Sequence, residues 1–413
     1  MQAFDPIAAM ARARHEFGEH GGVNMSIEAS TTFTVLAAER MPEIFAGRYG
    51  PERGGCYLYG RHFNPTVYAL GKRLAAMEST EMAYGVASGL AAIAAAVMQC
   101  CGAGDHLVAG NTIYGGSFAL LNEFLPMKAG VRTTFVDVSN LDEIRRAITP
   151  RTRAIYVESL ANPTLVVADI PQIAAIAHAH DLAIIVDNTF TPMMITPARL
   201  GADVVVHSLT KFVSGASDII AGAICASQEF VMTTMDLHTG SLMLLGPTMD
   251  PNVAFHLNLR LPHLGVRMKE HGRRALFLAE KLREVGVRVV YPGLDSHPQH
   301  ALFRSLMNEG FGFGGVLTID AGSLDRADAL MQRLQNTHSF GFIAVSLGYF
   351  DTLMSCSGST TSSEMSDEAR VRAGISPGLV RLSVGITGAI EDRWRQLEES
   401  LRHVGIIDSN AQP

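Results

Sequence analysis

The middle of the chain alternates between short apolar runs and segments with helical spacing. The apolar runs are rich in β-branched residues, and they cover residues 106–110, 154–159, 183–188 and 203–208. Between them, the segment IPQIAAIAHAH at 170–180 repeats apolar residues at the spacing of an amphipathic helix. Runs that are apolar on both faces are what a parallel sheet covered by helices requires. The pattern therefore predicts an α/β fold whose mostly parallel sheet belongs to a large domain at residues 65–260.

On either side of this region the pattern changes. The expected elements after it are a helix-rich stretch at 262–286, a strand at 316–320, a helix at 330–336 and a strand at 379–385. They predict a smaller C-terminal α+β domain over residues 261–413. Residues 1–64 lack strong periodicity and contain the breakers GG and PERGG. We expect this segment to be an arm that packs against another folded unit.

Composition and charge narrow the class of partner. The chain has 413 residues, which favours a large domain plus a smaller one, and its 47% hydrophobic content is enough for a sizeable core. The formal net charge of -7 is modest, and Lys and Arg are scattered along the chain. This distribution predicts a small-molecule partner and argues against nucleic acid or an anionic membrane surface.

Cysteine usage and the N-terminus indicate the compartment. The five cysteines include the adjacent Cys100 and Cys101 and show no C-x-x-C spacing, so neither a disulfide framework nor a zinc site is expected. Arg12 and Arg14 lie where a signal peptide needs an unbroken apolar stretch, and the longest apolar run, 90–98, is too short to span a bilayer. We therefore expect a cytoplasmic protein.

Two polar clusters follow neighbouring apolar runs. Asp187 follows AIIV, and Ser208, Thr210 and Lys211 follow DVVV. Because parallel strands end at a common sheet edge where ligands bind, we expect the two clusters to lie side by side. A carboxylate and a lysine there could form a simple ion pair. They are also what an aldehyde cofactor with a pyridine ring needs, since an amine forms an imine and a carboxylate keeps the ring nitrogen protonated.

A third cluster offers a place for a phosphate group. Ser88, Gly89 and Leu90 open a helix of small residues, and the first N–H groups of a helix can bind an anion. Ser208 and Thr210 add hydroxyl donors beside the lysine. A Ser-Gly pair before an alanine-rich helix can also be only a cap and close-packing device. Taken together, the three clusters favour pyridoxal 5'-phosphate (PLP).

Longer stretches of the chain resemble the Cys/Met-metabolism family of PLP enzymes, which includes cystathionine γ-synthases, cystathionine γ-lyases, methionine γ-lyases and O-acyl-homoserine sulfhydrylases. The matching stretches, in family order, are YLYGRHFNPTV (57–67), ASGLAAI (87–93), YVESLANPT (156–164), VDNTF (186–190), GADVVVHSLTKFVSG (201–215) and GLVRLSVG (378–385). GGVNMSIEASTTFTV, LMLLGPTMDPNVAF, LPHLGVRMKEH and GYFDTLMSCSGSTTSSE most resemble the plant-type methionine γ-lyases. The resemblance implies a PLP-dependent transferase-like large domain of the aspartate aminotransferase type.

The resemblance also implies roles for matching residues. Lys211 would hold the cofactor as an imine and shuttle the substrate Cα proton, and Asp187 would pair with the pyridine nitrogen. Tyr114 in NTIYGGS would stack on the cofactor ring and take part in catalysis. Arg381 would grip the substrate carboxylate, for which a planar two-pronged donor is well suited, unless it only forms a salt bridge between domains. Ser346 would contribute to the same substrate site.

Further implied roles concern the cofactor and the assembly. Asn162 would lie near the phenolic oxygen of PLP. Tyr59 and Arg61 would reach across a subunit interface to the cofactor phosphate of the neighbouring chain, and Tyr59 would also contact the substrate. Without the resemblance, the segment YGRHFNP would be interpreted as a surface turn. The arm at 1–64 would then contact a neighbouring subunit, and the family implies a homotetramer built as a dimer of dimers.

Several other motifs favour no separate function. GFGFGG at 310–315 spells G-x-G-x-x-G, but it precedes a strand instead of opening a helix. His297 and His300 have no neighbours that would complete a ligand set, so we predict no metal site. His207 is expected to be a packed strand-end histidine. The Ser/Thr-rich segment 355–364 is expected to form a loop over the active site.

The sequence constrains the reaction less than it constrains the cofactor. The plant-type resemblance favours a carbon–sulfur lyase that converts L-methionine to methanethiol, 2-oxobutanoate and ammonia by α,γ-elimination. The alternatives are γ-replacement, as in O-acyl-homoserine sulfhydrylases and cystathionine γ-synthases, and cystathionine γ-lyase activity. Many bacterial methionine γ-lyases have cysteine where this chain has Gly116, whereas the plant-type enzymes have glycine. A non-catalytic PLP-binding protein is disfavoured because Lys211, Asp187, Tyr114 and Arg381 are all present.

Overall fold

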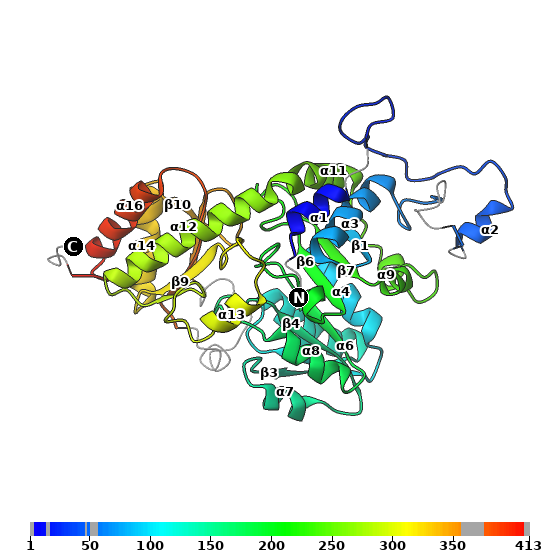
Figure 1. Ribbon diagram of the computed structural model, residues 1–413. Coiled ribbons are helices and arrows are strands. Elements are labelled where there is room, and N and C mark those ends of the chain that lie inside the picture. The colour runs from blue at the N-terminus through cyan, green and yellow to red at the C-terminus, as the bar shows by residue number, and fades with distance from the viewer. Residues whose placement is uncertain (1–3, 14–16, 46–47, 50–56, 357–375, 409–413) are drawn as a thin grey trace.

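The computed structural model has two lobes, each built around its own sheet (Figure 1). It describes residues 4–13, 17–45, 48–49, 57–356 and 376–408. Helix α12 (Leu264–Glu284) runs from one lobe to the other (Figure 1). In these ranges, no helix combines the length and the apolar character that crossing a membrane requires.

The sheet of the larger lobe has the order β1-β7-β6-β5-β4-β2-β3. Its strands are β1 (Met82–Val86), β2 (His106–Gly110), β3 (Arg132–Val136), β4 (Thr152–Glu158), β5 (Ala183–Asp187), β6 (Val204–Ser208) and β7 (Gly222–Ala226). Within the described ranges, four of its six strand pairs are parallel, and only β7 runs against its two neighbours. The expected mostly parallel sheet is confirmed. The β6–β7 connection contains Lys211 and spans 13 residues, all described, without a helix, which suits a reversal better than a helical crossover.

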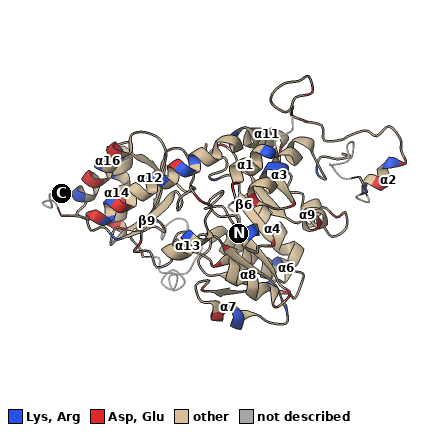
Figure 2. Cartoon of the chain, in the orientation of Figure 1, with Lys and Arg blue, Asp and Glu red and all other residues tan. Residues whose placement is uncertain are grey.

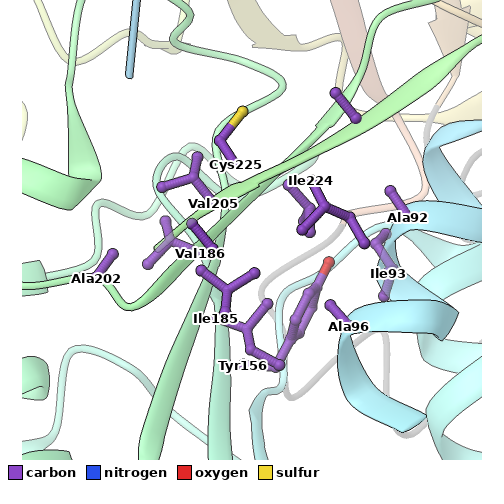
Figure 3. Close-up of a cluster of buried hydrophobic side chains, with 14 of the residues drawn as sticks. Ala92, Ile93, Ala96, Tyr156, Ile185, Val186, Ala202, Val205, Ile224 and Cys225 are labelled. Atoms are coloured by element: carbon purple, nitrogen blue, oxygen red, sulfur yellow. The ribbon is translucent and has the colours of Figure 1, made fainter. Parts of the chain in front are cut away.

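Helices cover both faces of this sheet (Figure 1). Their bounds are α1 (Pro6–Arg12), α2 (Arg40–Phe45), α3 (Pro65–Glu78), α4 (Gly89–Cys100), α5 (Gly115–Ala119), a π-helical turn (Leu120–Phe124), α6 (Leu125–Ala129), α7 (Leu141–Ala147), α8 (Ile170–His178), a 3-10 turn (Pro197–Leu200), α9 (Gln228–Thr234), α10 (Ser241–Leu245), α11 (Pro251–Arg260) and a 3-10 turn (Leu261–His263). Helix α4 is the most important for the site. Its small residues Ala92 and Ala96, with Ile93, lie against Tyr156 and Ile224 of the sheet (Figure 3). Small side chains let the helix backbone approach the strands closely, which fixes the position of its N-terminus.

The smaller lobe contains the second sheet, in the order β10-β11-β12-β9-β8. Its elements are β8 (Val289–Val290), β9 (Val316–Asp320), α14 (Leu324–Asn336), β10 (Gly341–Ile343), β11 (Thr352–Cys356), β12 (Leu379–Ser383) and α16 (Ile390–His403). Helix α13 (His300–Leu306), between β8 and β9, buries Phe303 and Leu306 in the core of the larger lobe. A separate cluster of buried apolar side chains lies between this sheet and helices α12, α14 and α16. On these helices, basic and acidic residues alternate along the surface (Figure 2). The expected smaller α+β part is confirmed, while the boundaries at residues 64 and 260 stay predictions.

The N-terminal region differs in part from an arm without regular structure. Helix α1 begins with Pro6, is capped by the Asp5 carboxylate, and buries Met10 in the core of the larger lobe. Its seven residues are too few to give a periodic signal in the sequence. Beyond it, the chain around α2 extends away from the body (Figure 1). Helix α1 therefore packs on its own chain, and the role of residues 1–64 as an arm on a neighbouring subunit stays a prediction.

Candidate active site

One pocket brings together most of the residues that the sequence predicted. It lies at the carboxyl ends of β4, β5 and β6, has a volume of about 390 Å³, and is bounded on its other side by residues of the smaller lobe. The predicted residues that line it are Ser88, Gly89, Leu90, Tyr114, Asn162, Asp187, Ser208, Thr210, Lys211, Ser346 and Arg381. Glu158 and Thr189 also line it, although the sequence analysis assigned them no role.

Lys211 presents a buried amine to this pocket. Its Nζ atom donates a hydrogen bond to Oγ of Ser346, at 2.9 Å. Burial, and then the positive charge of Arg381, lower the pKa of the amine to about 8, while Asp187 opposes this shift. In the described ranges, no direct ion pair joins Lys211 to Asp187. A larger share of this amine is therefore uncharged near neutral pH than of an exposed lysine.

Two carboxylates end neighbouring strands at the same edge. Glu158 of β4 and Asp187 of β5 are register partners. Asp187 accepts hydrogen bonds from the N–H of Thr189, at 2.9 Å, and from the hydroxyl of Tyr156, at 3.3 Å. Burial raises the pKa of Asp187, and burial together with the charge of Asp187 raises the pKa of Glu158 to about 8. A cation placed beside Asp187 would favour its ionised form, so the site suits a protonated ring nitrogen.

The N-terminus of α4 forms another wall. The Ser88 hydroxyl caps the helix by accepting the N–H of Ala91, at 3.1 Å. A Cβ atom on Gly89 would lie 2.5 Å from Cβ of Ser208, and one on Gly222 would lie 2.2 Å from the Ser88 carbonyl oxygen. Only glycine at these two positions lets the helix start approach the ends of β6 and β7 so closely. First-turn N–H groups and the Ser208 hydroxyl thus meet where a phosphate could bind.

Arg381 enters the pocket from β12 of the smaller lobe. It is only 2% exposed, and burial lowers the pKa of its guanidinium to about 10. It donates to the side-chain oxygen of Asn162, at 3.1 Å, and to the carbonyl oxygen of Ser346, at 2.7 Å. Its Nε has no hydrogen-bond partner, and no carboxylate of the described residues pairs with it. The alternative of a salt bridge between domains is therefore not realised within these residues.

Tyr114 is held at the mouth of the pocket. Its backbone N–H donates to Oε1 of Glu158, at 2.7 Å, and its side chain is 46% exposed. Gly116 lies directly against the ring, because a Cβ atom there would be 2.6 Å from Cε1 of Tyr114. The backbone at Tyr114 is thus held by a buried carboxylate, and the present ring position requires the absence of a side chain two residues later.

Tyr59 and Arg61 do not line this pocket. Arg61 donates to the carbonyl oxygen of Met243, at 2.6 Å, and its guanidinium lies 5.5 Å from the centroid of the Tyr59 ring. Tyr59 is 44% exposed. Within one chain, these two side chains are therefore separate from the other predicted site residues.

The motifs that favoured no function occupy ordinary structural positions. His207 is buried and lies 2.7 Å from Oε1 of Glu78 through its Nε2 atom. The glycine-rich segment 310–315 precedes β9. Among the described residues, no group of His, Cys, Asp and Glu could hold a metal ion. The predicted loop at 355–364 lies outside the described residues from position 357 onward.

The donor set around the pocket fits PLP with an amino-acid substrate. A desolvated amine, a buried carboxylate and a helix N-terminus correspond to the aldehyde, ring nitrogen and phosphate of the cofactor. The Nε–H of Arg381, which has no hydrogen-bond partner, is a donor suited to the carboxylate of an amino-acid substrate.

Comparisons with known proteins agree with this geometry. A methionine gamma-lyase of Arabidopsis thaliana is 54% identical over 96% of this chain and 90% of its own length, and an L-methionine gamma-lyase of Fusobacterium nucleatum is 36% identical over 93% of this chain and 95% of its own. Among solved structures, a cystathionine gamma-lyase of Lactobacillus plantarum complexed with L-serine aligns with a TM-score of 0.85 at 28% identity, covering 97% of this chain and all of that one.

A Campylobacter jejuni protein described as an O-acetylhomoserine (thiol)-lyase, solved with a pyridoxyl-lysine monophosphate group, aligns with a TM-score of 0.88 at 28% identity, with the same coverage. The family model described as Cys/Met metabolism PLP-dependent enzyme matches residues 7–402. The chain therefore belongs to the Cys/Met metabolism family of PLP-dependent enzymes, which act on small amino-acid substrates.

Proposed function

We propose that this protein is a methionine γ-lyase, which splits L-methionine into methanethiol, 2-oxobutanoate and ammonia. The observation that carries the proposal is one pocket that contains the amine of Lys211, the carboxylate of Asp187 and the buried guanidinium of Arg381. A buried cation with an unused donor favours an anionic ligand, and an amino acid supplies a carboxylate. The Arabidopsis relative supports the choice of methionine within the family.

Each part of the pocket has a place in holding the cofactor. PLP, when bound, supplies a ring that withdraws electrons from the bonds at the substrate Cα. Lys211 would bind its aldehyde, Asp187 would keep its ring nitrogen protonated, and Asn162 would lie near its phenolic oxygen. The phosphate would be held by Ser88, Gly89 and Leu90 at the start of α4, with the hydroxyls of Ser208 and Thr210.

The protein side chains would then move protons at fixed positions. Arg381 would hold the substrate carboxylate and so determine which bond at Cα is aligned for cleavage. Lys211, with its lowered pKa, would remove the Cα proton. Tyr114, at the mouth of the pocket, would donate a proton to the departing γ-thiolate. Ser346 would keep the Lys211 amine oriented through the hydrogen bond between them.

A product assay distinguishes elimination from replacement. We expect 2-oxobutanoate and methanethiol from L-methionine alone, at a higher kcat/KM than from cystathionine or homocysteine. The likeness to a protein described as an O-acetylhomoserine (thiol)-lyase makes γ-replacement the second candidate. If methionine yields no 2-oxobutanoate while O-acetylhomoserine plus sulfide rapidly yields homocysteine, the lyase assignment is wrong and the transferase stands.

We also propose that the site is shared between subunits of a homotetramer built as a dimer of dimers. Tyr59 and Arg61 lie away from their own pocket, on the segment that follows the extended N-terminal region. They would serve the cofactor phosphate of the neighbouring subunit, and Tyr59 would also contact its substrate. A cytoplasmic location stays a prediction from the cysteine usage.

Mixing two inactive variants tests this arrangement. Lys211→Ala chains and Arg61→Ala chains are each expected to be nearly inactive. After subunit exchange, half of the dimers are mixed and one of their two sites has both residues, so roughly a quarter of the wild-type sites should return. Activity is measured after exchange is verified with differently tagged chains. No recovery in verified mixed oligomers would contradict a shared site.

A further inference from the structure

Glu158 connects two walls of the pocket that come from different parts of the chain. Its Oε1 accepts the N–H of Tyr114, at 2.7 Å, and its Oε2 accepts the N–H of Asn162, at 3.1 Å. Tyr114 lies at the start of α5, whereas Asn162 lies in the loop after β4. One buried carboxylate therefore bonds to the backbone of both segments.

The connection extends to the proposed substrate anchor. The side-chain oxygen of Asn162 accepts a hydrogen bond from Nη1 of Arg381, at 3.1 Å. Asn162 thus connects Glu158 to the guanidinium of Arg381, and the backbone of Tyr114 connects Glu158 to the aromatic ring. The two ends of a substrate, its carboxylate and its γ-substituent, would be placed against these two groups.

We propose that Glu158 is a positioning residue, which fixes the Tyr114 ring and the Asn162–Arg381 pair relative to each other through its two carboxylate oxygens. This inference rests on the proposed function, since it assumes that Tyr114 and Arg381 contact cofactor and substrate. Glu158 itself takes no proton from the substrate in this proposal. Its effect is transmitted through the backbone of the two segments that it joins.

The chemistry of the contact requires a carboxylate of this length. Both partners are backbone N–H groups, so both oxygens must accept. A glutamine has nearly the same shape but offers one accepting oxygen and one NH₂ group, which would face an N–H donor. An aspartate keeps two acceptors and the charge but lacks one methylene. Neither replacement can hold both segments as Glu158 does.

The first test compares Glu158→Gln and Glu158→Asp with wild type, using Glu123→Gln at an exposed position as the matched control. We expect kcat/KM for methionine to fall by on the order of tenfold or more in both variants, because each loses at least one buried hydrogen bond. The visible circular dichroism of the bound cofactor, which reports its asymmetric surroundings, should change in both. Far-ultraviolet circular dichroism checks that each variant is folded.

A double-mutant cycle tests whether the effect passes through the ring. The loss caused by Glu158→Gln should be clearly smaller in a Tyr114→Phe background than in wild type, because linked residues are non-additive. Additive losses, or Glu158→Gln with unchanged cofactor dichroism and kcat/KM, would overturn the proposal. Full activity in Glu158→Asp would also overturn it, since the reach of both oxygens to the two segments would then not be required.

Failure of this inference can be told apart from failure of the proposed reaction. The dichroism of the cofactor needs no substrate, and the kinetic cycle can be repeated with O-acetylhomoserine and sulfide. If wild-type enzyme makes no 2-oxobutanoate from methionine, the proposed reaction is wrong while the role of Glu158 is still tested.

Discussion

Replacing Lys211 with alanine is expected to lower kcat for methionine by about 10²–10⁴-fold, the range that general acid–base groups contribute. The same amine would bind the cofactor aldehyde and move the Cα proton, and burial already lowers its pKa to about 8. Turnover is measured by 2-oxobutanoate formation with PLP in excess. Lys128→Ala, at an exposed position on α6, is the matched control and should keep full activity.

Chemical labelling gives an independent readout of the same assignment. The purified protein should be yellow, and borohydride should attach the cofactor irreversibly to the peptide that contains Lys211. Peptide mapping by mass spectrometry identifies the site. A label on Lys72 or Lys269, or a colourless protein with full activity, would contradict the assignment of Lys211.

Replacing Arg381 with methionine should give the second largest loss of activity, mainly as a lower kcat/KM for methionine. Methionine is similar in length to arginine but carries no charge, so the substrate carboxylate would enter a buried site without its partner. Removing one member of a buried, hydrogen-bonded charge pair costs about 2–5 kcal/mol, or roughly 30- to 4,000-fold. Steady-state kinetics with methionine measure the loss, and Arg326→Met on the exposed face of α14 is the control.

A substrate analogue separates this role from a structural one. 3-(Methylthio)propylamine lacks only the carboxylate of methionine, so its affinity should be similar in wild type and in Arg381→Met. A comparable loss of affinity for the analogue would mean that Arg381 supports the fold of the pocket and does not bind the carboxylate.

In the larger sheet, the strands that the sequence predicted are those with clear apolar runs. The runs at 183–188 and 203–208 each contain three consecutive β-branched residues, and both of them, like the apolar run at 106–110, form strands. The strands of this sheet that were missed have weaker signals: β1 (MAYGV) and β7 (GAICA) contain glycine and small residues, and β3 lies at an edge with alternating exposure. The antiparallel direction of β7 could not be predicted, because direction depends on the connection and not on the composition of a strand.

The residues of the candidate site also fall into those that a sequence pattern predicts and those that it does not. Asp187 and Lys211 were found because polar residues at the carboxyl ends of parallel strands share one edge. Glu158 ends β4 at that same edge, so the same rule could have found it. Arg381 and Ser346 come from the other lobe, and no local pattern predicts that two lobes meet at one pocket. For these two residues, only the resemblance supplied a role.

The contact between Gly116 and Tyr114 restricts how this site can change during evolution. A cysteine at position 116 would place its Cβ atom 2.6 Å from Cε1 of the present ring. The substitution is therefore accessible only if the tyrosine ring turns aside. A side chain at position 116 should consequently set the angle of the Tyr114 ring, and adding it alone to this chain should give a worse enzyme than the present one.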